Sequence, residues 1–122
     1  MRINPLLFIL KWKVLSNQHI YWMSRYIKYM KPEAKKKKID YIFQLKEQSK
    51  NQNITFYNDD VELNIKYYFH DKRVRDIDNY QKLIQDSMEW ILFENDKQIK
   101  KLTLEKFIDK ENPRVEILIK KY

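Results

Sequence analysis

Carboxylates are concentrated in one segment of the chain, at a spacing that suits a metal ion. Asp76 and Asp78 lie two residues apart, and Asp96 follows eighteen residues after Asp78. On an extended backbone, side chains two residues apart point to the same side. Two neighbouring carboxylates repel each other unless they share a cation, and oxygen ligands suit Mg²⁺, or Mn²⁺ in its place. The spacing therefore predicts a divalent-metal site, with Asp96 as a third ligand.

A metal ion held in this way orients a water molecule and stabilises charge on a phosphodiester oxygen. Lys82, four residues after Asp78, is placed to neutralise a phosphate under attack. The same residues also fit structural roles. Asp78 followed by Gln81 is a helix-capping pattern. Asp78, Lys82 and Asp86 form an i, i+4 ion-pair stripe, and Asn95–Asp96 suits a turn. The spacing alone leaves both interpretations open.

The acids follow the clearest secondary-structure signal in the chain. Apolar and polar residues alternate strictly over 61–69, which predicts a half-buried strand. A helix is predicted over 78–92, with an apolar stripe of Tyr80, Ile84, Met88 and Ile91. Asp78, Lys82 and Asp86 lie about 200° around this helix from the stripe. The acids therefore occupy a strand-to-helix corner, and the helix turns its polar face away from the core.

The remaining elements complete one α+β domain over residues 1–122. We predict a strand over 6–15, an irregular loop over 16–31 and a helix from Pro32 to about Gln48. The apolar stripe expected for that helix is Ile39, Ile42 and Leu45. Two more strands are predicted near 98–107 and 114–120. The order β-α-β-α-β-β indicates a mixed sheet of about four strands with two main helices.

Composition excludes several classes of protein. The 122 residues include no cysteine and no glycine. The chain therefore has no disulfide framework, no thiolate nucleophile, no zinc knuckle and no glycine-rich nucleotide loop. Two histidines in total argue against a histidine-based metal site, and His70 is expected at the surface. The apolar run Leu6–Leu10 is too short to span a bilayer. We expect a cytoplasmic protein with no nucleotide cofactor and no membrane partner.

Positive charge is concentrated in the first 50 residues, which hold 12 basic and 3 acidic side chains of a chain with net charge +8. A coding bias toward lysine would act evenly along the chain, so the clustering favours a polyanionic partner such as nucleic acid. Tyr21, Trp22 and Tyr26 lie among these residues, either to stack on exposed bases or as core or dimer-interface residues. The candidate phosphate contacts are Lys11, Lys13, Arg25, Lys28, Lys31 and Lys35 to Lys38.

The acidic segment resembles the RusA family of Holliday-junction resolvases, small endonucleases found in phages and prophages. The family pattern is Arg-Asp-x-Asp-Asn-x-x-Lys, an Asp four residues later, then Asp-Asp-x-Gln followed by Ile or Val. Here it reads Arg75-Asp76-Ile77-Asp78-Asn79-Tyr80-Gln81-Lys82, then Asp86, then Asn95-Asp96-Lys97-Gln98-Ile99. The resemblance covers about Leu15 to Lys120, and residues 75–99 are its specific part.

The resemblance implies a Mg²⁺-dependent endodeoxyribonuclease that nicks two strands of a four-way junction as a homodimer, in DNA recombination and repair. It implies that Asp76, Asp78 and Asp96 bind the metal, that Lys82 supports cleavage and that Arg75 helps to hold DNA. Asn95 departs from the pattern and removes a charge from the site. The basic residues expected at the DNA are Arg73, Arg75, Lys28, Lys31, Lys35 and Lys36.

Two other functions fit the sequence. The first is a DNA-binding module without catalysis, in which the acids are caps and ion pairs. The second is a structural or interaction protein, whose behaviour would be insensitive to salt because it has no affinity for DNA.

Overall fold

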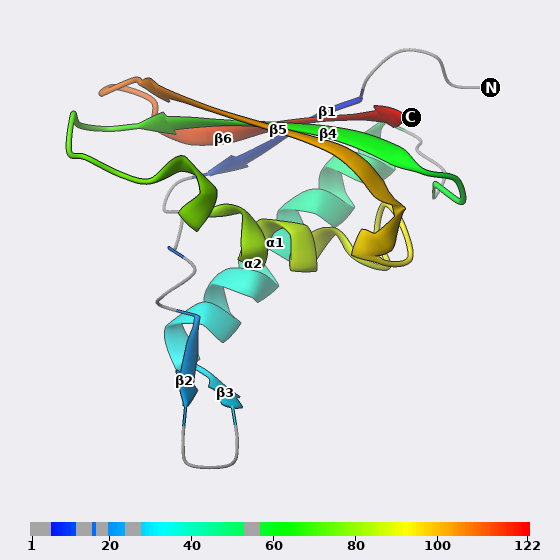
Figure 1. Cartoon of the computed structure of the whole chain (residues 1–122), viewed down its shortest axis with the longest axis horizontal. Helices are drawn as coiled ribbons and strands as arrows, with labels where there is room; N and C mark the ends of the chain where they lie inside the picture. Colours follow the sequence, from blue (N-terminus) through cyan, green and yellow to red (C-terminus); the bar gives the residue numbers. More distant parts are fainter. Residues whose placement is uncertain (1–5, 12–15, 17–19, 24–27, 53–56) are drawn as a thin grey trace.

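The structure is a computed structural model that describes residues 6–11, 16, 20–23, 28–52 and 57–122. Its main layer is a four-stranded sheet in the order β1-β6-β4-β5, in which β5 runs parallel to β4 and the other pairs are antiparallel. Two helices, α1 and α2, cover one face of this sheet (Figure 1). The predicted α+β domain is confirmed. The elements are β1 Leu6–Lys11, α1 Pro32–Asn51, β4 Val61–Phe69, α2 Gln81–Met88, β5 Ile99–Ile108 and β6 Arg114–Lys121.

The central strand β4 organises the core. Its alternate residues are buried against the helices, while those between them are half-buried on the opposite face. This strand matches its prediction residue for residue, because strict alternation is the direct signature of a sheet with one covered face. The buried side chains of β4 and of its neighbours β6 and β1 are Val61, Leu63, Ile65, Tyr67, Phe69, Val115, Ile117, Ile119, Leu6, Phe8 and Leu10.

Helix α1 begins at Pro32 as predicted, but it buries a different stripe. Its buried residues are Ala34, Tyr41 and Leu45, whereas Ile39 is 68% exposed. Ile39 lies about 140° around the helix from Ala34. The predicted stripe through Ile39 was therefore wrong, although Leu45 does belong to the core.

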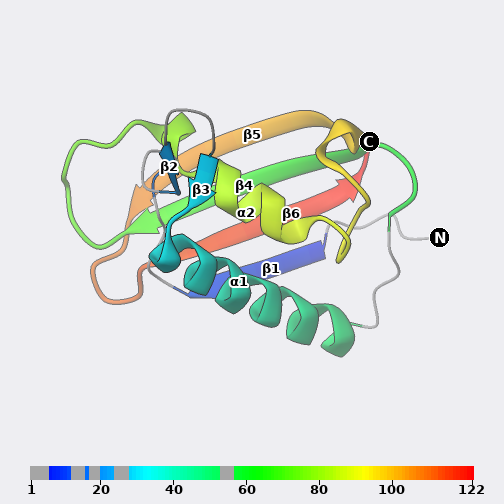
Figure 2. The same cartoon turned by 90° about the horizontal axis from the view of Figure 1, so that it is seen from below.

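Glutamines of α1 cover the outer edge of β1. Gln48 Nε2 donates to the carbonyl oxygen of Ile9 at 2.6 Å, and Gln48 Oε1 accepts from the Ile9 N–H at 2.7 Å. Gln44 and Gln52, one helical turn to either side, bond the β1 backbone two residues away at 2.8 and 2.9 Å. These bonds satisfy backbone groups that an edge strand otherwise leaves open. Figure 2 shows α1 running beside β1.

Other segments differ from the prediction. The expected loop over 16–31 contains a hairpin of β2 (Tyr21–Met23) and β3 (Lys28–Met30), whose strands are too short to show alternation. Residues 12–15 of the predicted first strand lie outside the described residues. Short 3₁₀ turns, η2 (Ile77–Asn79) and η3 (Asp96–Gln98), flank α2, which is shorter than predicted. Among the described residues, no helix is long and apolar enough to cross a membrane.

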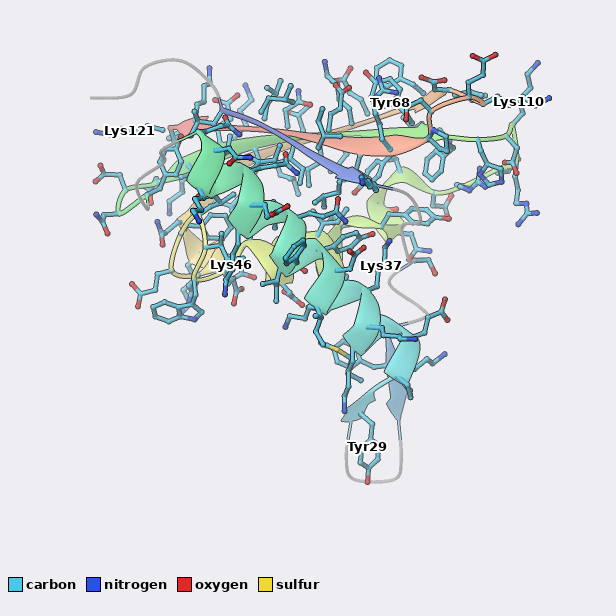
Figure 3. All side chains as sticks on the ribbon, turned by 180° about the vertical axis from the view of Figure 1, so that it is seen from behind. Tyr29, Lys37, Lys46, Tyr68, Lys110 and Lys121 are labelled. Carbon is cyan, nitrogen blue, oxygen red and sulfur yellow. The ribbon has the colours of Figure 1, made fainter. Side chains whose placement is uncertain are left out.

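Gln48→Met should lower the free energy of unfolding by about 1–3 kcal/mol, because the Ile9 N–H and carbonyl lose their side-chain partners. Urea denaturation followed by circular dichroism measures this change. Lys46→Met, at an exposed position of the same helix (Figure 3), is the matched control and should leave the midpoint almost unchanged. Equal midpoints for the two variants would contradict the role given to Gln48.

Candidate functional site

The segment between β4 and β5 carries the acidic pattern from Arg75 to Gln98, and the last pattern residue, Ile99, begins β5. Because β4 and β5 are parallel, residues 70–98 must cross from one end of the sheet to the other. The crossover consists of a loop, η2, α2, a turn and η3 in succession (Figures 1 and 2). The pattern therefore coincides with a single structural unit.

Asp76 and Asp78 are both exposed at η2. Ile77 between them packs against the core. Tyr80 fixes the start of α2, because its ring lies 6.0 Å from that of Tyr67 in β4 and also contacts the Phe69 ring at 5.4 Å. The alternation of acids outside and apolar side chains inside keeps both carboxylates in solvent.

Neither acid is the assigned N-cap of α2, and Asp76 makes no capping bond at η2. Asp76 occupies the N-cap of η2 without a capping bond from its side chain. Helix α2 begins at Gln81 with Tyr80 at its N-cap, so Asp78 is not its capping residue. The ion-pair alternative is confirmed for one pair, since Lys82 Nζ lies 3.6 Å from Asp86 Oδ2.

Arg75 braces the loop that precedes the acids. Its side chain is 9% exposed, and its guanidinium donates to Asp71 Oδ1 at 2.8 Å and lies 4.4 Å from the centre of the Phe69 ring. Lys106 Nζ of β5 donates to the Arg75 carbonyl oxygen at 2.8 Å. The DNA contact expected of Arg75 remains a prediction. Its contacts with Asp71, Phe69 and Lys106 show that it stabilises this loop. Arg73 is exposed.

At the other end of the crossover, Asn95 and Gln98 form a capping box at η3. Asn95 Oδ1 accepts from the Lys97 N–H at 2.7 Å, and Gln98 Oε1 accepts from the N–H groups of residues 94 and 95. Gln98 Nε2 also donates to the carbonyl oxygens of Tyr57 and Asp59, each at 2.9 Å. Gln98 is a positioning residue that the sequence analysis missed, although it stands in the quoted pattern.

Glu89, which lies outside the pattern, is a second residue that the sequence analysis missed. Its carboxylate accepts a hydrogen bond from the Asp96 N–H. Burial raises the pKa of Glu89, and the negative charges of Asp86 and Asp96 raise it further. Asp96 itself is exposed. This end of α2 is therefore acidic.

The predicted metal ligands do not meet within one chain. Asp76 and Asp78 precede α2, and Asp96 lies beyond its other end (Figure 2). Gln98 ties the Asp96 turn to residues just before β4, whereas Asp76 follows β4. Of the residues that the structure describes, no three His, Asp or Glu side chains lie close enough together to hold a metal ion.

A family model for the endodeoxyribonuclease RusA matches residues 14–120. The chain belongs to the RusA family. The match covers nearly the whole domain, including all of the crossover. RusA proteins are endodeoxyribonucleases of the Holliday-junction resolvase type, so DNA is the substrate class. None of the curated proteins matches the chain.

The basic residues expected at RusA DNA contacts differ in their exposure. Lys35 and Lys36 on α1 are exposed, while Lys31 is half-buried at the helix N-cap. Lys37 lies 5.0 Å from the centre of the Tyr41 ring, so its side chain folds back onto the core (Figure 3). The side chain of Lys28 lies outside the described residues. Lys35 and Lys36 are thus the members of the lysine run best placed to meet DNA.

The structure also bears on the predictions for His70 and for the aromatic residues near Tyr21. His70 is exposed as expected, with Nε2 3.1 Å from Asp71 Oδ2. Tyr21 packs against the core, which favours the structural role for that aromatic residue. The side chains of Trp22 and Tyr26 lie outside the described residues.

Protonation of Asp71 should loosen the loop before the RusA acids. Hydrogen bonds from the Arg75 side chain and the Arg73 N–H lower the pKa of Asp71. A lowered pKa stabilises the fold above the ordinary carboxylate value of about 4, and this contribution is lost as the pH falls through the folded-state pKa. Asp71→Asn should therefore lower the melting temperature at pH 7, and its difference from wild type should shrink below about pH 4. A difference that is constant with pH would contradict the ion pair.

Proposed function

We propose that this RusA-family chain is a Mg²⁺-dependent resolvase that nicks four-way DNA junctions as a homodimer, in recombination and repair. The observation that carries the proposal is the exposed pair Asp76 and Asp78, held out by Ile77 and Tyr80 in the register of the family pattern. Mg²⁺ binds a small number of carboxylates and keeps several waters, which suits an exposed pair. A cation there would provide positive charge beside a phosphodiester.

We place the third ligand on the second subunit. Helix α2 has eight residues and is roughly 12 Å long, so it separates Asp96 from Asp78 within one chain. A two-fold axis across the middle of α2 exchanges its two ends. Asp96 of one copy then lies beside Asp76 and Asp78 of the other, and symmetry repeats the arrangement. Two equivalent sites result, as paired nicking requires.

The charges on α2 support this arrangement. Lys82 and Asp86 lie one turn apart on the polar face of α2, and Asp78 precedes the helix in η2, so the signs alternate along the chain. When two copies of such a face lie antiparallel, Lys82 of each comes near acidic residues of the other, so the charges attract. Lys82, 46% exposed beside Asp86, is then close to both sites and able to neutralise a phosphate.

Asp78→Asn should reduce Mg²⁺-dependent nicking of a synthetic four-way junction to below about 1% of wild type, because the cation loses a charged ligand. Junction binding without metal should change by less than about threefold, since the residue carries no positive charge to the DNA. Gel assays of nicking and of binding measure the two effects. Undiminished nicking by this variant would sink the assignment.

Co-refolding Asp78→Asn with Asp96→Asn tests the shared site. Each variant alone should be inactive. In the mixed dimer one site has both acids and the other has neither, so nicking should return to about a quarter of wild type, as single nicks. Mn²⁺ binding followed by electron paramagnetic resonance should return in parallel.

Asp76→Asn mixed with Asp78→Asn is the matched control for that experiment. Both substitutions affect the same half of the site, so no combination of these subunits restores it. Equal inactivity of the two mixtures would show that each site lies within one chain.

The separation of the acids within one chain also favours a second candidate, a DNA-binding module without catalysis. The wild-type protein distinguishes the two functions. A module binds the four-way junction but yields no product when Mg²⁺ is added.

A further inference from the structure

A cavity of about 360 Å³ is lined by the loop that precedes the exposed acids. It lies between the loop before Asp76 and the C-terminal end of β5. Its apolar lining comes from Phe69, Val74, Phe107 and Ile108. Lys72 and Arg73 also line it and are exposed. An apolar cavity bordered by cations suits a ligand that is flat and apolar on one part and anionic on another.

We propose that this cavity binds one unstacked nucleotide of the DNA substrate. The base packs against Val74, Phe107 and Ile108, and the adjacent phosphates lie at Lys72 and Arg73. The volume is at the lower end of the range for ligand sites, which fits a single nucleotide. The inference rests on the proposed function, because it takes DNA as the ligand. It adds a means of selecting branched substrates.

Phe107, the exposed aromatic wall, is held in place before any ligand arrives. Its ring stacks on Tyr68 of β4 at 5.0 Å between centres, with 20° between the planes. The Arg114 guanidinium of β6 lies 3.9 Å from the centre of the Tyr68 ring. The Arg114 guanidinium also forms ion pairs with Asp109 Oδ2 and Glu116 Oε2, each at an N–O distance of 2.8 Å. Residues of β5, β4 and β6 therefore hold the Phe107 ring in place. Stacking a base on this ring would cost little additional side-chain entropy.

The charges at the cavity favour a nucleic-acid strand. The Asp71 carboxylate is neutralised by Arg75, which leaves Lys72 and Arg73 as the exposed charges of the loop. These cations stand three and four residues before Asp76. A DNA strand that extends from the acids along this loop would pass the cavity.

We expect the cavity to favour branched DNA, because removing a base from a stacked duplex costs free energy. A base inside a duplex must lose pairing and stacking before it can enter a pocket, and the loss is smallest where pairing is already interrupted. The branch point of a four-way junction interrupts stacking, whereas a linear duplex does not. The cavity would consequently accept nucleotides at the branch point more readily.

A coupling experiment tests the cavity directly. Binding of the wild type and of Phe107→Ala is measured without metal, on intact junctions and on junctions with one abasic nucleotide at successive positions from the branch point. At one position, base removal should weaken wild-type binding about tenfold, as expected for one stacked base. Phe107→Ala should weaken binding to the intact junction equally, and the two losses should not add.

Leu102→Ala is the matched control, because Leu102 lies on the same strand with 38% exposure against 40% for Phe107. It should bind like the wild type and remain sensitive to the abasic position. Ile108→Trp fills the cavity without removing its aromatic wall and should reproduce the Phe107→Ala result.

Additive losses, or no sensitive position, would overturn the nucleotide site while leaving the nuclease proposal intact. Coupling without any Mg²⁺-dependent nicking would overturn the nuclease proposal and retain the site. Failure of the wild type to bind the junction would overturn both.

Discussion

Parallel pairing of β4 with β5 is the constraint on which the site depends. Two parallel strands cannot be joined by a tight turn, so the chain must return along the whole sheet before β5 begins. Asp76 follows the end of β4, and Asp96 precedes the start of β5. The nine residues of β4 span roughly 30 Å. The topology itself therefore separates the acids that the sequence pattern lists together.

The separation of Asp76 from Asp96 could not be predicted from the sequence, whereas the local features on either side of it could. Strand β4 could be predicted because its alternation depends only on neighbouring residues, and the acidic pattern could be found because it is continuous in sequence. The relative position of Asp76 and Asp96 depends on the pairing of β4 and β5, which periodicity does not encode. The buried stripe of α1 was missed for a related reason. Ile39 and Phe43 are apolar yet exposed, because the approach of the helix to the sheet selects Ala34 and Tyr41 instead.

The two edge strands of the sheet, β1 and β5, differ in how their outer backbone groups are covered. At β1 the row of glutamines from α1 supplies hydrogen bonds to the outer backbone edge. At β5, the opposite edge strand of the described sheet, β4 is the only paired strand. Both ends of the crossover lie next to β5, since η2 contacts this strand and η3 leads into it. An unpaired edge tends to associate with other chains unless it is protected. The β5 edge, whose backbone pairs only with β4 in the described sheet, is thus flanked by the two turns that carry the acids.

The departure of Asn95 from the family pattern is best understood through its bonds. Its side-chain oxygen accepts from the Lys97 N–H, a capping role that asparagine and aspartate fill about equally well. Gln98 completes the same cap and ties η3 to the residues before β4. Asp96, by contrast, is exposed and bonds Glu89 through its backbone N–H. The pattern therefore combines acids that face solvent with residues that hold the turn. Asparagine in place of aspartate at position 95 affects a residue that caps η3. The substitution therefore preserves the turn that exposes Asp96.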